Sequence, residues 1–167
     1  VFSFLQRMGK SFMLPTAVLP VAGIFLGVGS SLTNETTIAA LHLESVLGQG
    51  TFLYSVLILL KQVGKVLFDN LPLIFAVSIA LGMSKRRKEV AALAAIIAFF
   101  VMHATINTLL CLDGSIVNGV VSNYILDGSI TSVCGMLSLE MGVFGGIVVG
   151  LGVSYLHIIF CFLISSA

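Results

Sequence analysis

The chain has 167 residues, of which 58% are hydrophobic and only 9% are charged, and its formal net charge is +1. A soluble domain usually carries about 25% charged residues and about 45–50% apolar ones, so a mean hydropathy of +1.16 excludes a soluble fold. The composition predicts an all-α integral membrane protein whose main partner is the lipid bilayer, and the small net charge gives no reason to expect a nucleic-acid partner.

The first predicted element is a transmembrane helix. A helix needs roughly 20 apolar residues to cross the hydrocarbon core, and the uncharged run between Lys10 and Glu35 is long enough. We place the first span at about 12–32, after a short interfacial helix in VFSFLQRMGKSF (residues 1–12). A cleaved signal peptide would need a shorter apolar region and an A-x-A-like site, which this segment lacks.

The next apolar region allows two interpretations. Two lysines, Lys61 and Lys65, would together cost roughly 5–7 kcal/mol at the membrane centre. We therefore expect an amphipathic helix in the outer interface over residues 51–65. A second span follows at about 66–84, with Pro72 near its outer end. The alternative is one long tilted helix whose lysines reach the headgroups.

Two more spans complete the predicted topology, at about 90–110 and about 141–163. Between them lie residues 111–140, which are rich in Gly, Ser and Asn and predict a long outer loop with a re-entrant or surface segment. The sequence thus predicts about four transmembrane helices plus interfacial amphipathic helices.

The distribution of charge predicts the orientation of these helices. The predicted cytoplasmic anchors are Arg7, Lys10, Lys85, Arg86, Arg87 and Lys88. The segments 33–50 and 111–140 contain no Lys or Arg, and their charged residues are Glu35, Glu44, Asp113, Asp127 and Glu140. By the positive-inside rule, both termini and the basic loop are cytoplasmic, and the acidic segments face outward.

Small residues recur every four positions along two of the predicted spans. They are Gly142, Gly146 and Gly150 in the last span, and Gly23 and Gly27 in the first. This spacing lets helix backbones approach closely, which favours helix association in lipid. The contact could lie within one subunit or between the two subunits of a homodimer, and both interpretations stay open.

Polar residues inside a span are candidates for function. His103 and Asn107 are four residues apart and therefore share one face of the third span, so they are weak candidates for binding a substrate or lining a solute path. We favour the alternative that they hydrogen-bond to a neighbouring helix. His157, near the cytoplasmic end of the fourth span, is interpreted as an interfacial residue.

Motifs of soluble enzymes are absent from the sequence. There is no P-loop, H-E-x-x-H, nucleophile elbow or C-x-x-C motif, so we identify no catalytic residue and expect no metal ion or cofactor. Cys111, Cys134 and Cys161 lack metal-binding spacing, although the first two share the outer loop and could pair. The sequon at Asn34 matters only in a eukaryotic secretory pathway, which we do not expect.

Three segments resemble, in order, the signatures of one family. The first segment is LQRMGKSFMLPTAVLPVAGIFLGVGSSL, which matches the pattern L-Q-x-x-G-K-x-x-M-L-P-x-A-x-L-P. The second is NLPLIFAVSIALGMSK together with VAALAAIIAFFVM, and the third is MGVFGGIVVGLGVSYLH. These segments resemble enzyme IIC, the membrane permease component of the bacterial phosphotransferase sugar transporters, in its glucose–maltose–N-acetylglucosamine branch. The resemblance covers most of the chain.

The resemblance implies a function in the bacterial cytoplasmic membrane. Enzyme IIC takes a sugar from outside, here of the glucose or maltose type, and carries it across. A phosphocysteine of a partner IIB domain then phosphorylates the sugar, with phosphate that descends from phosphoenolpyruvate. None of the three cysteines stands in a soluble domain, so none is interpreted as that phosphocysteine.

The resemblance also implies that the chain is the N-terminal part of a longer permease domain. In the family this part is mainly a scaffold that forms the dimer, and the sugar-binding glutamate and histidine lie mostly in the later half. We therefore interpret residues 1–167 as the scaffold and dimerisation half and transfer no sugar-binding residue. The alternatives are a small oligomeric channel lined by His103 and Asn107, and a truncated structural remnant without transport activity.

The resemblance ends at His157. The family usually continues with a polar, basic stretch and a Pro-containing segment, whereas residues 158–167 contain no Lys or Arg and are mostly apolar. We expect residues 158–167 to be a frameshifted or prematurely terminated tail, and the alternative is a divergent helix end.

Overall fold

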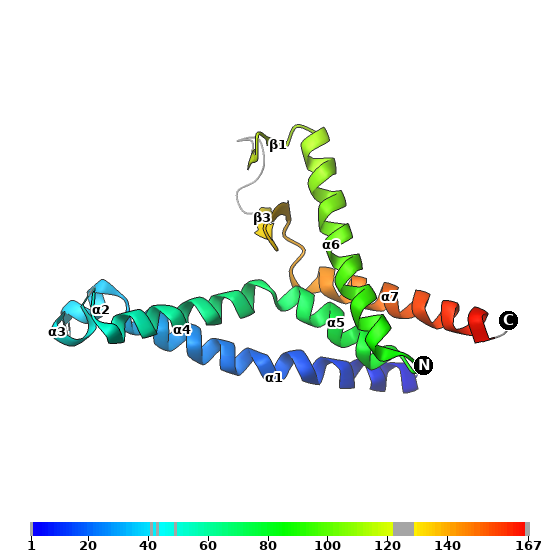
Figure 1. Cartoon of the computed structure of the whole chain (residues 1–167), viewed down its shortest axis with the longest axis horizontal. Coiled ribbons are helices and arrows are strands. Elements are labelled where there is room, and N and C mark those ends of the chain that lie inside the picture. The colour runs from blue at the N-terminus through cyan, green and yellow to red at the C-terminus, as the bar shows by residue number, and fades with distance from the viewer. Residues whose placement is uncertain (1, 41, 43, 49, 122–128, 166–167) are drawn as a thin grey trace. The chain divides into compact units, whose positions relative to one another are not determined.

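Figure 1 shows the fold as a computed structural model, which describes residues 2–40, 42, 44–48, 50–121 and 129–165. The described part is mostly helical, which confirms the predicted helical membrane fold. The chain divides into two compact units, residues 16–69 and residues 1–15 with 70–167. Asp127 of the acidic outer segment, and Ser166 and Ala167 of the expected tail, lie outside the described residues.

Among the described residues, three helices are long and apolar enough to cross a membrane, at three of the four predicted places: α1 (Phe2–Leu32), α6 (Lys88–Leu112) and α7 (Gly142–Ser165). Helix α1 is continuous, so the segment predicted as a separate interfacial helix is its first part. At 1.5 Å per residue, α1 extends over about 46 Å. It is therefore longer than the hydrocarbon core of about 30 Å.

The region of the second predicted span has other boundaries than expected. Helix α4 (Phe52–Asp69) runs past the predicted junction, and α5 (Leu71–Met83) starts only after Asn70. Pro72 lies in the first turn of α5, and in one continuous helix its ring would clash with the carbonyl four residues earlier. With 13 residues, α5 covers only about 20 Å. A fourth span therefore requires α4 and α5 to act together as one broken span.

In the unit of residues 16–69, helices α1 and α4 meet at two glycines. A Cβ atom on Gly64 would lie 2.5 Å from the backbone nitrogen of Leu26, and one on Gly29 would lie 2.6 Å from the backbone nitrogen of Lys61. Only glycine, which has no Cβ, fits at these two positions. Such close approach gives two helices the van der Waals contact that holds them together in lipid.

Two short helices, α2 (Glu35–Ala40) and α3 (Glu44–Leu47), complete this unit. Asn34 caps α2, because its Oδ1 accepts a hydrogen bond from the backbone nitrogen of Thr36 at 3.0 Å. A small apolar core consists of Ile38, Leu47 and Leu57. These contacts connect α2 and α3 to the first turns of α4.

In the other unit, α5 is the central element. Seven of its thirteen residues are buried, and α6 and α7 cover it (Figure 1). Small residues allow this burial, since Ala80, Ala91 and Ala95 form one completely buried cluster between α5 and α6. A second cluster contains Ala76, Phe99 and Val149 and joins all three helices.

The described part of the segment between α6 and α7 contains two antiparallel β-hairpins, which the sequence did not lead us to predict. Their strands are β1 (Ile116–Val117), β2 (Val120–Val121), β3 (Ile130–Val133) and β4 (Met136–Leu139). The turn dipeptides Asn118-Gly119 and Cys134-Gly135 have positive φ at both residues, as the favoured two-residue hairpin turn requires. Asn-Gly is a strong hairpin signal, so the first hairpin was predictable.

Candidate functional site

His103 and Asn107, the candidate residues of the third predicted span, hold a hairpin against α6. His103 Nδ1 lies 2.7 Å from Ser138 Oγ, and Asn107 Nδ2 donates to the Leu137 carbonyl oxygen at 2.6 Å. Both partners belong to β4. The neighbouring element is therefore a strand, and not the helix that the sequence analysis favoured.

Burial decides what this pair of contacts can do. A hydroxyl beside an imidazole is also the arrangement of an activated nucleophile, which a substrate must be able to reach. Ser138 is 0% exposed and His103 is 2% exposed, and the Phe99 ring stands edge-on to the imidazole with 4.6 Å between the ring centroids. The enclosed geometry supports attachment of the hairpin, because leaving either group without its partner would cost about 1–3 kcal/mol.

The turn of the same hairpin carries a thiol outside the membrane-spanning segments. The Cys134 thiol donates to Asn70 Oδ1 at 3.5 Å, and burial raises the pKa of this thiol. Cys111 is exposed near the end of α6, and both cysteines are free, so the structure does not contain the pair that the sequence allowed. Within the described residues, no group of three His, Cys, Asp or Glu side chains could hold a metal ion.

The glycines predicted to pack in the last span differ in their surroundings. A Cβ on Gly146 would lie 2.8 Å from the carbonyl carbon of Pro72, and one on Gly150 would lie 2.8 Å from the Ala76 carbonyl oxygen. Both glycines therefore contact α5 of the same chain. Gly142 begins α7 with a φ of 51°, and no described atom lies within 4 Å of where its Cβ would be.

The glycines predicted to pack in the first span, Gly23 and Gly27, also face open space within 4 Å. Further close contacts between helices involve three glycines that were not among the predicted packing residues. They are Gly29, Gly64 and Gly82, the last of which would place a Cβ 2.7 Å from the Ser11 Cβ. Gly64 is the only glycine of α4, so no small-residue spacing could have identified it.

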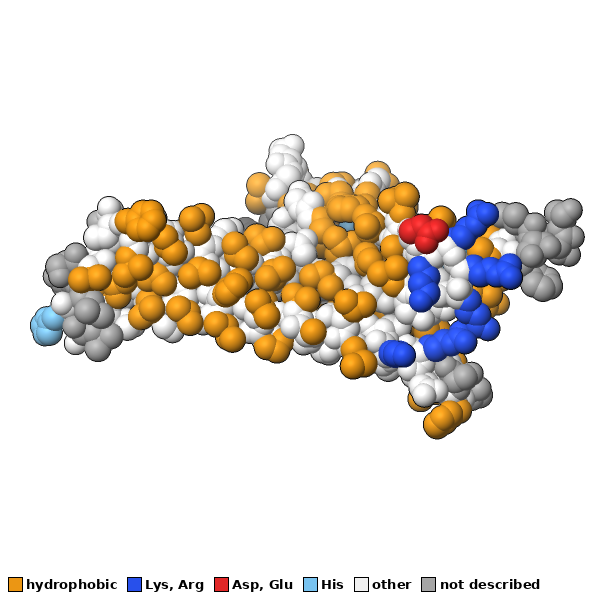
Figure 2. Space-filling model, turned by 60° about the horizontal axis from the view of Figure 1, so that its bottom comes forward, with side chains coloured by type: hydrophobic (Ala, Val, Ile, Leu, Met, Phe, Trp, Pro, Cys, Tyr) orange, Lys and Arg blue, Asp and Glu red, His pale blue; other side chains and the backbone are white. Residues whose placement is uncertain are grey.

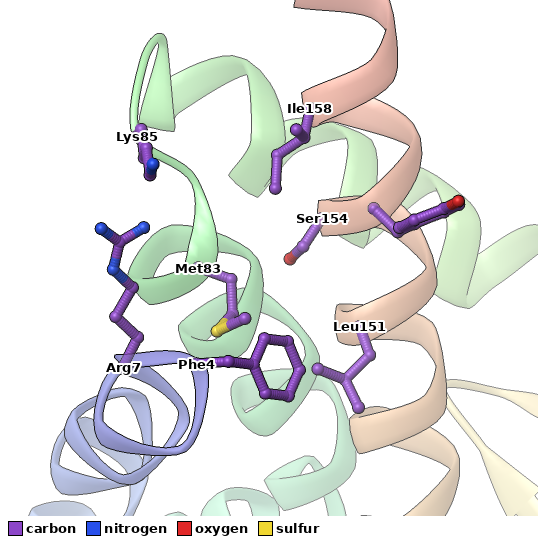
Figure 3. Close-up of a pocket in the computed structure, with 8 residues that line it drawn as sticks. Phe4, Arg7, Met83, Lys85, Leu151, Ser154 and Ile158 are labelled. Atoms are coloured by element: carbon purple, nitrogen blue, oxygen red, sulfur yellow. The ribbon is translucent and has the colours of Figure 1, made fainter. Parts of the chain in front are cut away.

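The predicted basic anchors belong to one unit, and Lys and Arg side chains gather at one end of the face that Figure 2 shows. Arg7 of α1 and Lys85, after the end of α5, line the same cavity (Figure 3). Arg86 receives a contact from α7, because His157 Nε2 lies 2.9 Å from the Arg86 carbonyl oxygen. The first turns of α1, the end of α5 and α7 therefore meet at this basic end.

Comparison with known proteins identifies the family. Residues 9–162 match the family described as Phosphotransferase system, EIIC. The chain is 37% identical over 150 residues to the PTS system glucose-specific EIICBA component of Staphylococcus saprophyticus subsp. saprophyticus, with 90% of this chain and 20% of the relative covered. It is 34% identical over 157 residues to the PTS system maltose-specific EIICB component of Escherichia coli (strain K12), with 94% of this chain and 29% of the relative covered.

The chain therefore spans less than a third of the length of these two curated relatives. Its apolar helices form a multi-pass membrane protein. Because the family match extends from the first part of α1 to the last turns of α7, the chain belongs to the phosphotransferase system EIIC family.

Proposed function

We propose that this chain is part of a phosphotransferase-system sugar permease, which carries a sugar of the glucose or maltose type across the bacterial cytoplasmic membrane. The observation that carries the proposal is the EIIC match over residues 9–162, together with relatives named as glucose-specific and maltose-specific components. The names of these relatives, EIICBA and EIICB, support a IIB domain as the partner that phosphorylates the sugar.

Within such a permease, we assign residues 1–167 to the scaffold and dimerisation half. The burial of α5 under α6 and α7 supports this role, because it forms a packed support from small residues. The bonds from His103 and Asn107 to β4 favour a scaffold over a small channel, since the two side chains that could line a pore are engaged in holding the hairpin.

The dimer contact is proposed to involve the open glycine face of α1. Gly146 and Gly150 are covered by α5, whereas Gly23 and Gly27 meet no described atom within 4 Å. Small residues of this kind allow a helix of a second subunit to approach closely. We expect Gly27→Leu to lower the dimer fraction of the purified protein in detergent without changing its helix content. An unchanged dimer fraction would exclude this face.

The proposed orientation places the basic end in the cytoplasm. Six basic residues lie at or beside the ends of α1, α5 and α6 in this unit, and the positive-inside rule assigns such a cluster to the cytoplasmic side. The hairpins between α6 and α7 then face outward, with Asp113 and Glu140 as the acidic residues among their described neighbours.

A chimera tests the proposed function. In the glucose-specific relative, the matched segment is replaced by this chain, and the product is made in cells that lack their own glucose permease. We expect phosphoenolpyruvate-dependent phosphorylation of labelled glucose in membrane vesicles from the chimera, and none from the chain alone. A chimera that is membrane-inserted at normal levels but inactive, while the relative itself is active, would contradict the proposal.

A further inference from the structure

A cavity at the basic end combines apolar walls with a charged rim. It has a volume of about 600 Å³, which is within the range of about 300–1,000 Å³ of small-ligand sites. Phe4, Met83, Leu151 and Ile158 supply apolar wall, and Arg7 and Lys85 supply the positive charge. Figure 3 shows Phe4, Met83 and Leu151 grouped together, with Arg7 and Lys85 at one side of the cavity.

The charge around this cavity has one sign. None of the described side chains that line it is acidic. A second, smaller cavity of about 140 Å³ shares Lys85 and Ile158 and adds Arg86. Arg7 and Lys85, from two separate parts of the chain, therefore border the larger cavity, and Arg86 borders the smaller one beside it.

These features together specify the chemistry of the occupant. The positive charges of Arg7 and Lys85 attract an anionic group. The apolar wall of the cavity disfavours an anion that keeps its full hydration shell. The ligand must therefore carry a negative group at one end and a hydrocarbon part at the other. In a membrane protein, basic pockets between helices that lie on the side of the basic loops bind anionic lipid headgroups.

We propose that this cavity binds one anionic phospholipid of the bilayer, with its phosphate between Arg7 and Lys85 and part of an acyl chain against Phe4, Met83 and Leu151. The site joins the first turns of α1 to the end of α5 and to α7, so a bound lipid would bridge three elements of one unit. This inference goes beyond sugar transport and depends neither on the sugar nor on the IIB partner.

Tryptophan fluorescence can report on this site because the chain contains no Trp. Tyr155 lines the cavity and its neighbour Leu156 does not. Both side chains are exposed, Tyr155 by 68% and Leu156 by 55%. Tyr155→Trp and Leu156→Trp thus place one reporter inside the site and one beside it on the same helix. Each variant is reconstituted in phosphatidylcholine vesicles with increasing amounts of brominated phosphatidylglycerol or brominated phosphatidylcholine, whose bromine atoms quench nearby Trp.

We expect the Trp at position 155 to be quenched preferentially by the brominated phosphatidylglycerol, and the Trp at position 156 to show no headgroup preference. A basic residue near the membrane surface strengthens anionic lipid binding by about 1 kcal/mol, which is about a five-fold change in affinity. Arg7→Gln with Lys85→Gln should therefore lower the preference at position 155 by up to about 30-fold. Salt at about 1 M, where the Debye length is about 3 Å, should lower it as well.

The matched control is Arg87→Gln with Lys88→Gln. These residues are exposed and line neither cavity, yet the double change removes the same charge. We expect this control variant to keep the preference for phosphatidylglycerol at position 155 within about two-fold, because its removed charges act on the site only over a long, screened distance. Circular dichroism establishes that both double variants are folded.

Three results would overturn the proposal. One is an equal headgroup preference at positions 155 and 156, and another is an equal loss of preference in the two double variants. The third is quenching at position 156 with none at position 155, which would mean that protein and not lipid covers the cavity. Sugar phosphorylation by the chimera is a separate measurement, so either proposal can fail without the other.

Discussion

Replacing Gly146 with alanine tests the contact between α5 and α7 that organises the larger unit. A Cβ at this position would lie 2.8 Å from the carbonyl carbon of Pro72, and it would also contact the Pro72 carbonyl oxygen. These are backbone atoms, so no side-chain rotation relieves the overlap. Helix α7 must therefore move away from α5.

The cost of this movement follows from the packing. Ordinary contact of a Cβ begins at 3.4 Å, so the carbonyl carbon alone requires the helices to separate by about half an ångström, and the nearer carbonyl oxygen requires more. A gap of about 0.5–1 Å forfeits a quarter to a half of the dispersion attraction across it, and Ala76 and Val149 are among the residues that face this gap. Overpacking usually costs about 1–3 kcal/mol. We expect Gly146→Ala to cost about 3 kcal/mol because the obstacle is backbone.

Gly152 provides a matched control on the same helix, since a Cβ there meets no described atom within 4 Å. Gly152→Ala should leave the stability unchanged or raise it by up to about 1 kcal/mol, because alanine has the higher helix propensity. The free energy of unfolding is measured by SDS titration in mixed micelles, followed by far-ultraviolet circular dichroism. If Gly146→Ala were as stable as Gly152→Ala, the close contact between α5 and α7 would be refuted.

Three further predictions concern the hairpin and the orientation. Asn107→Ala removes the donor to the Leu137 carbonyl oxygen, so we expect the free energy of unfolding to fall by about 1–2 kcal/mol and a thiol reagent to label Cys134 faster. An unchanged labelling rate would contradict the attachment of the hairpin. Because burial raises the pKa of Cys134 and only the thiolate reacts, its alkylation, in a variant without the other cysteines, should be slow at neutral pH and accelerate as the pH rises above the usual thiol range. The same shift favours the folded state below the usual thiol pKa, and that contribution is lost as the pH rises. An impermeant thiol reagent outside intact cells should label Cys111 and not Arg87→Cys, and the reverse result would invert the orientation.

Much of the membrane architecture was predictable from the sequence. The uncharged runs located α1, α6 and α7, because crossing the hydrocarbon core requires a minimum apolar length that hydropathy along the chain measures directly. The break near Pro72 was only partly predicted. The proline indicated a helix start, but the expected helix change at residue 65 was four residues before the observed end of α4.

The candidate site was less predictable, and His103 illustrates why. Its spacing to Asn107 correctly placed both side chains on one helical face. Their partners, Ser138 and Leu137, lie 30 or more residues away in a strand whose length gives little sequence signal. A strand of four residues is recognised mainly by its turn, and the Cys134-Gly135 turn is not a common hairpin dipeptide.

The sequence by itself determined that this chain is a helical membrane protein and which of its segments are long enough to span. These properties are sums over neighbouring residues, so local composition is sufficient to predict them. Only the tertiary structure decided that Gly29, Gly64 and Gly146 lie against a backbone while Gly23 and Gly27 do not. The physical reason is that a close helix contact depends on which two faces meet, and a glycine looks the same in the sequence whether it faces lipid or another helix.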